Sequence, residues 1–258
     1  MAELDARRQK LKDDFTKARG YWASLWDGVL ELSPDFFEAY LNFSSVPWRS
    51  GVLPPKIKEM IYIAIDAATT HLYAPGTYVH MRNAIGYGAT KEEIMEVLQL
   101  TSVLGIHTMS LGLPALIAEM QAAGRGAEVA PKPLTAYQER LKAEFTANRG
   151  YWSESWDGLL QLSPEFFEAY VQLSSVPWKT GTLEPKVREF IYIAIDASTT
   201  HLFLPGLRIH IQNALRLGAT VHEIMEVMQL TSVLGIHTIT EGVPILLEEA
   251  EKSAKPAG

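Results

Sequence analysis

The sequence predicts an all-α protein built from two tandem copies of one helical domain. Three observations support this prediction. The chain of 258 residues repeats itself at a register of about 130 residues without a gap. Helix-start signals precede apolar segments in both copies, and no alternating apolar and polar run lies between hairpin turns. A period this long that occurs only twice is typical of a duplicated domain, because solenoid units are shorter and more numerous.

The two copies are joined by a segment with the composition of a linker. GYWASLWDGVLELSPDFFEAY from Gly20 corresponds to GYWSESWDGLLQLSPEFFEAY from Gly150. Between these copies, the segment GRGAEVAPKP has two glycines, two prolines and no apolar periodicity. We therefore predict a first domain at residues 1–123, a linker at 124–134 and a second domain at 135–258.

The first helix signals of each copy lead to its apolar centre. At Ser33-Pro34 the serine can cap free amides and the proline fits a first turn, so a helix is expected through DFFEAYLNF. Ser163-Pro164 repeats this signal. The segment after Pro55, KIKEMIYIAIDAATTHL, is apolar almost all round. Such a segment is typical of a buried central helix, although its isoleucines would also suit a buried strand.

Further helix boundaries follow in the second half of each copy. Pro75-Gly76 is expected to interrupt the helical structure of the chain, and a short helix is expected from about Thr77 to near Gly88. Thr90 to Glu93 forms a capping box that opens a long helix, IMEVLQLTSVLGIHT, which we expect to end at His107. Thr220 to Glu223 forms the same box.

Composition excludes several classes of function. The chain has 23 Lys and Arg against 30 Asp and Glu, and its basic residues are scattered, so no binding to nucleic acid or to an anionic membrane is expected. It has no cysteine, which excludes disulfides, thiolate nucleophiles and zinc-thiolate sites. The start, MAELDARRQKLKDDF, has no signal-peptide core, and no segment approaches the roughly eighteen uncharged apolar residues of a membrane span. We expect a cytoplasmic protein with a small-molecule partner.

Polar side chains interrupt the apolar central segment at helical spacing. Glu59, Tyr62 and Asp66 are three or four residues apart, which places them on one helix face, and Thr69 and Thr70 continue the pattern. Charged groups on a buried helix must be paired, be hydrogen-bonded or face a cavity. These groups therefore either stabilise the fold or line a site.

The histidines are duplicated in the same way. His80 shares a helix face with Asn83, His71 lies near the end of the apolar central segment, and His107 closes the long helix. His222 is the one histidine without a counterpart, and we expect it at the surface. We predict that the following residues of both copies bind substrate: Tyr62, Asp66, His71, Asn83, His107, Tyr192, Asp196, His201, Asn213 and His237.

Three interpretations of the carboxylate and histidine set remain open. In the first, Glu59 with His80 and Glu189 with His210 form catalytic acid/base pairs, because a buried glutamate and a histidine are common proton-transfer groups. In the second, Glu59 only stabilises a helix amide terminus and His80 is a satisfied interior histidine. In the third, His71, His80 and Glu59 hold a metal ion, although their spacing matches no known zinc signature. We predict no metal and no cofactor.

The residues that carry these groups resemble a known family. KEMIYIAIDAATTHL, then His80, then NAIGYGATKEEIMEVLQL is similar to the carboxymuconolactone decarboxylase and alkylhydroperoxidase D-like family, over about half of each copy. The resemblance implies an all-α bundle that oligomerises, often as pairs of subunits around a threefold axis. Each chain would then correspond to such a pair of subunits, and three chains would correspond to a hexamer. A homo-oligomer is therefore expected.

Two chemistries are implied by the resemblance. Peroxidase members use a Cys-x-x-Cys pair where this chain has THLYAPG and THLFLPG, so a thiol peroxidase is excluded. Lactone decarboxylase members act without a cofactor, and Glu59 and His80 would be their acid/base groups here. A dicarboxylate lactone calls for guanidinium partners, yet Arg19 and Arg149, the only arginines present in both copies, lie outside the matching segment.

The sequence thus predicts a cofactor-free acid/base enzyme that decarboxylates, isomerises or hydrates a small organic acid, lactone or cyclic metabolite. A non-catalytic ligand-binding or assembly protein on the same fold is the first alternative. A histidine and carboxylate metal enzyme is the second.

Overall fold

The fold is all-α, as the sequence predicts. A computed structural model describes residues 5–254, and that range contains helices and no strand. The ends of the two predicted domains, residues 1–4 and 255–258, lie outside the described residues. The first copy comprises α1 (Ala6–Arg19), η1 (Ser24–Trp26), α2 (Asp27–Leu32), α3 (Pro34–Ser50), α4 (Pro55–Ala67), α5 (Ala74–Gly86), α6 (Lys91–Ser102), η2 (Val103–Ile106) and α7 (His107–Ala122). After η3 (Gly126–Glu128), the second copy comprises α8 (Ala136–Arg149), η4 (Glu154–Trp156), α9 (Asp157–Leu162), α10 (Pro164–Ser174), α11 (Val176–Thr180), α12 (Pro185–Ala197), α13 (Leu204–Arg216), α14 (Val221–Ser232), η5 (Val233–Ile236) and α15 (His237–Ala254).

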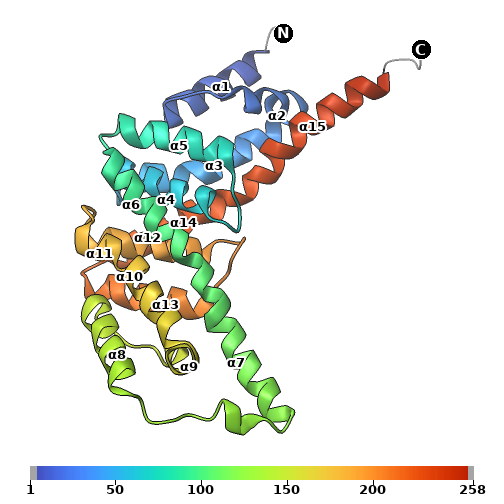
Figure 1. Ribbon diagram of the computed structural model, residues 1–258. Helices are drawn as coiled ribbons and strands as arrows, with labels where there is room; N and C mark the ends of the chain where they lie inside the picture. Colours follow the sequence, from blue (N-terminus) through green and yellow to red (C-terminus); the bar gives the residue numbers. More distant parts are fainter. Residues whose placement is uncertain (1–4, 255–258) are drawn as a thin grey trace.

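The centre of the molecule is shared by both copies. Helices α4 and α12 pack against each other, and each also contacts α6 and α14 (Figure 1). A single apolar cluster joins them and includes Ile61 and Ile191, both fully buried. This packing explains why α4 is apolar on almost every side: it contacts its own copy on one side and the other copy on the opposite side. The strand alternative for this segment was wrong.

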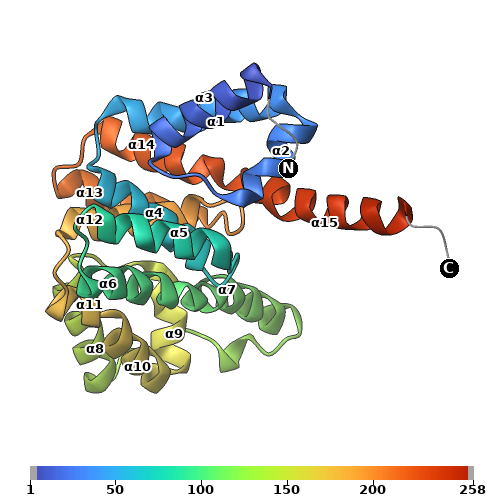
Figure 2. The same cartoon turned by 90° about the horizontal axis from the view of Figure 1, so that it is seen from above.

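The last helix of each copy crosses to the other copy. Helix α7 packs on α9, and α15 packs on α2 (Figures 1 and 2). The aromatic cluster around Trp26 accordingly includes Ile236, and the cluster around Trp156 includes Ile106. Each end of the molecule is therefore built from both copies, although the covalent repeat runs in simple tandem.

Several predicted boundaries differ from the structure. Pro75-Gly76 does not interrupt the chain: α5 begins at Ala74, because proline needs no amide partner in a first helical turn. Helix α4 ends at Ala67, so Thr69 and Thr70 lie beyond it. Ser33 contributes its carbonyl oxygen, which accepts from the Phe37 amide at 3.0 Å, and not a side-chain cap.

The long helix also differs from the prediction. Both capping boxes are present and open α6 and α14. The chain does not stop at His107, however, because a 3-10 turn at Val103–Ile106 leads directly into α7, which runs on to Ala122. The histidine therefore lies at the start of the crossing helix.

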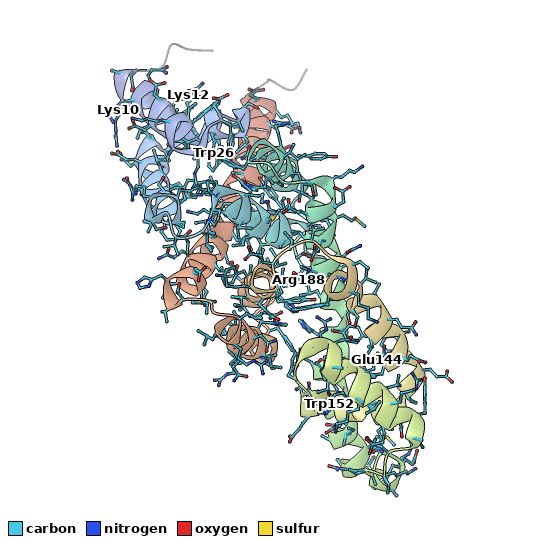
Figure 3. All side chains as sticks on the ribbon, turned by 90° about the vertical axis from the view of Figure 1, so that its left-hand side faces the viewer. Lys10, Lys12, Trp26, Glu144, Trp152 and Arg188 are labelled. Atoms are coloured by element: carbon cyan, nitrogen blue, oxygen red, sulfur yellow. The ribbon has the colours of Figure 1, made fainter. Side chains whose placement is uncertain are left out.

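Two buried ion pairs join the copies. Lys58 Nζ lies 2.9 Å from Glu226 Oε1, and both side chains are 2% exposed. Arg188 Nε lies 2.6 Å from Glu96 Oε1, at the centre of the view in Figure 3. Glu226 also accepts the Leu53 amide at 2.9 Å, so its charge is hydrogen-bonded as well as paired. These pairs attach α4 to α14 and α12 to α6 at the core.

Two helical segments, Lys91–Ala122 and Val221–Ser253, are long and apolar enough to cross a membrane by length and composition. The expectation that no segment approaches a span was therefore wrong by that measure. Each segment is two helices joined by a 3-10 turn, and its first helix carries a buried, ion-paired glutamate, Glu96 or Glu226. Core helices pass the same test, so these segments are weak evidence for a membrane, and a cytoplasmic location stays a prediction.

Candidate active site

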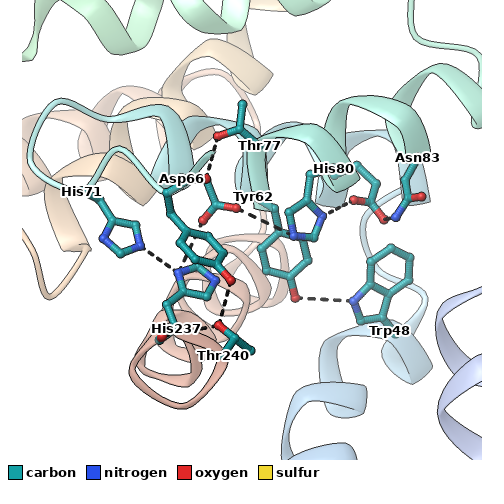
Figure 4. A network of polar contacts seen from close by, with 11 residues as sticks. Trp48, Tyr62, Asp66, His71, Thr77, His80, Asn83, His237 and Thr240 are labelled. Atoms are coloured by element: carbon teal, nitrogen blue, oxygen red, sulfur yellow. Dashed lines mark hydrogen bonds and ion pairs between the residues drawn. The ribbon is translucent and has the colours of Figure 1, made fainter. Parts of the chain in front are cut away.

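Two adjacent helices position the predicted acid/base pair. Glu59 lies on α4, is almost completely buried, and faces α5, which carries His80 and Asn83. His80 Nδ1 donates to Glu59 Oε2 at 2.6 Å, and Asn83 Nδ2 donates to Glu59 Oε1 at 3.2 Å (Figure 4). Glu59 is not in the first turn of its helix. The structural alternative, in which it stabilises a helix amide terminus, therefore does not describe its contacts.

The second copy repeats this geometry closely. His210 Nδ1 lies 2.7 Å from Glu189 Oε2, and Asn213 Nδ2 donates to Glu189 Oε1 at 3.2 Å. The imidazole of His210 also stacks on Tyr192, with ring centroids 4.4 Å apart. A carboxylate that accepts from Nδ1 fixes the ring orientation and leaves Nε2 free for exchange with a ligand.

Each site also takes a histidine from the other copy. His71 Nε2 lies 2.7 Å from His237 Nδ1, and His237 Nδ1 lies 3.8 Å from Asp66 Oδ1 (Figure 4). The counterpart cluster joins His201 to His107 at 2.6 Å and His107 to Asp196 at 3.8 Å. The metal combination weighed from the sequence is not brought together, because His71 lies with Asp66 and His237 while Glu59 lies with His80.

The carboxylates of the two clusters, which belong to Asp66 and Asp196, are deeply buried. Asp66 and Asp196 are each 1% exposed, and none of their side-chain oxygens has a hydrogen-bond partner among the described residues. Burial raises the pKa of Asp66 to about 7, against the opposing effect of His80. Burial also lowers the pKa of His237 to about 3, with smaller contributions from His71 and His80.

A cavity opens beside each acid/base pair. The first has a volume of about 70 Å³, the second about 50 Å³, and both are lined by aromatic side chains from the amino-terminal part of the copy. The lining of the first cavity includes Tyr62, Tyr73, His80, His237 and Thr240. In the second, Phe203 and Ser110 occupy the places of Tyr73 and Thr240, so a hydrogen bond of 2.7 Å between Tyr73 and Thr240 has no counterpart there.

One arginine lines each cavity, and we did not predict either as a site residue. Arg19 lines the first and Arg149 the second. Arg19 Nη2 donates to the Ser44 carbonyl at 2.7 Å, and its guanidinium lies over the Trp48 ring at 5.3 Å from the centroid. The available signal was the duplication itself, since Arg19 and Arg149 are the only arginines present in both copies. The fold brings them to the site from outside the segment that resembles the family.

Comparison with known proteins agrees with this fold. The model of the carboxymuconolactone decarboxylase family matches residues 34–111 and 164–238, which together are more than half of the chain. The chain therefore belongs to the carboxymuconolactone decarboxylase family. No curated protein matches it. A crystal structure from Burkholderia xenovorans LB400, described as a candidate gamma-carboxymuconolactone decarboxylase subunit, is similar with 46% identity and a TM-score of 0.92, and the alignment covers 96% of this chain and 98% of that one. The protein is thus decarboxylase-like, with two family domains in tandem.

Proposed function

We propose that the protein is a lyase that decarboxylates a small lactone or cyclic acid bearing two carboxylates, with one active site per copy. The observation that carries this proposal is that His80, which donates to Glu59 at 2.6 Å, lines the same cavity as the partly buried Arg19. This reaction requires an acid/base group and a cation that binds the substrate carboxylate, both in one small pocket. The name of the solved relative, a candidate gamma-carboxymuconolactone decarboxylase subunit, supports the same substrate class.

The proposed reaction uses these side chains in sequence. Arg19 binds the carboxylate that the substrate retains, which orients the second carboxylate for loss. The carbon–carbon bond to that second group breaks, carbon dioxide leaves, and the electron pair of the bond delocalises towards the lactone carbonyl. His80 then gives its Nε2 proton to carbon, while Glu59 stabilises the imidazolium through Nδ1–H. Water returns the proton to His80 after each turnover.

The arginines give the first test of this proposal. Changing Arg19 and Arg149 together to glutamine is expected to raise KM for gamma-carboxymuconolactone by about 10- to 100-fold, because a hydrogen bond to a charged group contributes about 1.5–3 kcal/mol. Steady-state kinetics on the double variant measures the change. Arg49→Gln is the matched control, since Arg49 is exposed and lines neither cavity. An unchanged KM in the double variant would show that the guanidinium groups do not bind substrate.

We also propose a homo-oligomer of three chains. The crossing helices expose apolar side chains at equivalent positions, Leu116 on α7 and Leu246 on α15, at 49% and 58% of their surface. Leu111 on α7 and Ile245 on α15 are exposed as well, and apolar side chains that gather into one exposed patch are typical of a subunit contact. Multi-angle light scattering is expected to give three times the 28.7 kDa chain mass, and Leu116→Glu with Leu246→Glu is expected to give single chains. A single-chain mass for the unchanged protein would contradict this assembly.

A further inference from the structure

We propose that each copy holds a site for one divalent transition-metal ion, formed by Asp66, His71 and His237 in one case and by Asp196, His201 and His107 in the other. The proposal goes beyond the decarboxylase function, which assigns proton transfer to a different pair, Glu59 and His80. Neither the sequence spacing nor the family resemblance predicts these ligands, because each set combines both copies.

The two imidazoles and the carboxylate converge on one point. The ligand atoms of Asp66, His71 and His237 all lie within 4.8 Å of one another, and so do those of the second set. In both sets Nε2 of the loop histidine faces Nδ1 of the crossing-helix histidine. Two histidines and one carboxylate are a common ligand set for zinc and for non-haem iron, and they leave coordination positions open for water or substrate.

The buried carboxylates lack the partner that such an ion would provide. Within residues 5–254, neither side-chain oxygen of Asp66 has a hydrogen-bond partner, and the residue is 1% exposed. The nearest imidazole nitrogens are His237 Nδ1 at 3.8 Å and His80 Nε2 at 3.9 Å, and both distances are too long for a hydrogen bond. The two side-chain oxygens of Asp196 likewise have no hydrogen-bond partner within that range. A buried carboxylate in this position is normally paired or bound to a metal.

The loop histidine is held in place by a neighbouring leucine whose backbone conformation is uncommon for leucine. Leu72, next to His71, has φ +54°, and Leu202, next to His201, has φ +53°. Leucine rarely adopts this left-handed conformation, and strained residues of this kind gather at functional sites. The Tyr73 amide donates to the Asp66 carbonyl at 2.8 Å, so the loop folds back onto the end of α4 and brings His71 to the carboxylate.

The crossing-helix histidine is oriented by stacking. The His237 ring lies 3.8 Å from the Tyr73 ring at 18°, and His107 lies on Phe203 at the same distance and angle. The cluster therefore keeps its geometry although the hydroxyl of Tyr73 is absent from the second copy. A surface hollow lined by His71, His237 and Glu241 reaches the first cluster, which gives an ion an entry path.

Binding would need a small adjustment. Nitrogens that bind one tetrahedral zinc ion at about 2.0–2.1 Å lie about 3.3 Å apart, whereas His71 and His237 are 2.7 Å apart. His71 is partly exposed and lies in a loop, so its ring can move by the required fraction of an ångström.

Calorimetric titration of the full chain with Zn²⁺, after EDTA treatment and removal of the chelator, tests the proposal. We expect two ions per chain for the unchanged protein, one for His71→Ala, and none at the same affinity for His71→Ala with His201→Ala. Loss of a ligand is expected to weaken the affected site at least about 100-fold. Asp66→Asn, which keeps the shape of the side chain, is expected to reproduce the loss seen with His71→Ala. Circular dichroism checks that each variant is folded.

Two controls separate this site from adventitious binding and from the decarboxylase function. His222→Ala removes an exposed histidine without a counterpart and is expected to leave two ions bound. His80→Asn with His210→Asn is also expected to leave two ions bound, whatever its turnover. The proposal is overturned if the unchanged protein takes up no stoichiometric Zn²⁺, or if binding is the same in the His71→Ala, His201→Ala double variant.

Discussion

Changing His80 and His210 together to asparagine is expected to lower kcat for decarboxylation by about 10²- to 10⁴-fold, the usual contribution of a positioned proton-transfer group. Asparagine keeps a polar side chain of similar reach that can still contact Glu59 or Glu189, so the cavity should keep its shape. Steady-state kinetics with gamma-carboxymuconolactone measures the loss. Each single variant should keep the activity of the other site, because each copy has its own pair and cavity.

The same variants distinguish an enzyme from a binding protein on this fold. A non-catalytic protein would show a lower melting temperature in the double variant and no change in any turnover. Asn83→Ala is a useful companion, because it removes the 3.2 Å contact to Glu59 without touching the imidazole. It is expected to have a much smaller effect on kcat. If the His80→Asn, His210→Asn protein turns over substrate at the original rate, the assignment of the acid/base pair is wrong.

Lys58→Met is expected to lower the free energy of unfolding by about 3–5 kcal/mol. The substitution leaves Glu226 charged and buried without its cation, and an uncompensated buried charge has a cost of that order. Urea unfolding followed by circular dichroism measures it, as a shift in the transition midpoint. The double variant Lys58→Met with Glu226→Met removes both charges and is expected to recover part of the loss, since no buried charge is left unpaired while the Leu53 amide loses its acceptor.

An exposed ion pair provides the matched control. Lys10, which is labelled at the edge of the molecule in Figure 3, pairs with Asp14 on α1, and the two side chains are 74% and 44% exposed. Lys10→Met is expected to change stability by less than about 1 kcal/mol. If Lys58→Met has no larger effect than Lys10→Met, then Lys58 and Glu226 do not contribute to the junction between the copies as described.

Local signals predicted the parts of the fold that depend on nearby residues. The capping boxes at Thr90 and Thr220 satisfy two amides within one turn, so the sequence alone determines them. The spacing of His80 and Asn83 placed them on one helix face, and both contact Glu59. Pro75 was misjudged because proline either breaks a helix or begins one, and only the position of the first turn decides which.

The partners of His107 and His237 could not be predicted in this way. A tandem repeat does not reveal whether a terminal helix packs on its own copy or on the other, because the local sequence is the same in both cases. Arg19 was missed for a related reason: its contacts to Ser44 and Trp48 depend on how α1 and α3 pack, and not on any local motif. The parts of the site that escaped prediction are those that depend on tertiary packing.

The crossing of α7 and α15 limits how the duplicated halves can diverge. A fragment ending at residue 123 would retain His107 without His201, and it would retain His71 without His237. Neither half is thus a self-sufficient unit, and a substitution in one crossing helix alters the pocket of the opposite half. The linker joins two copies that already depend on each other. A change that gives one pocket a new specificity must therefore be made partly in the sequence of the other copy.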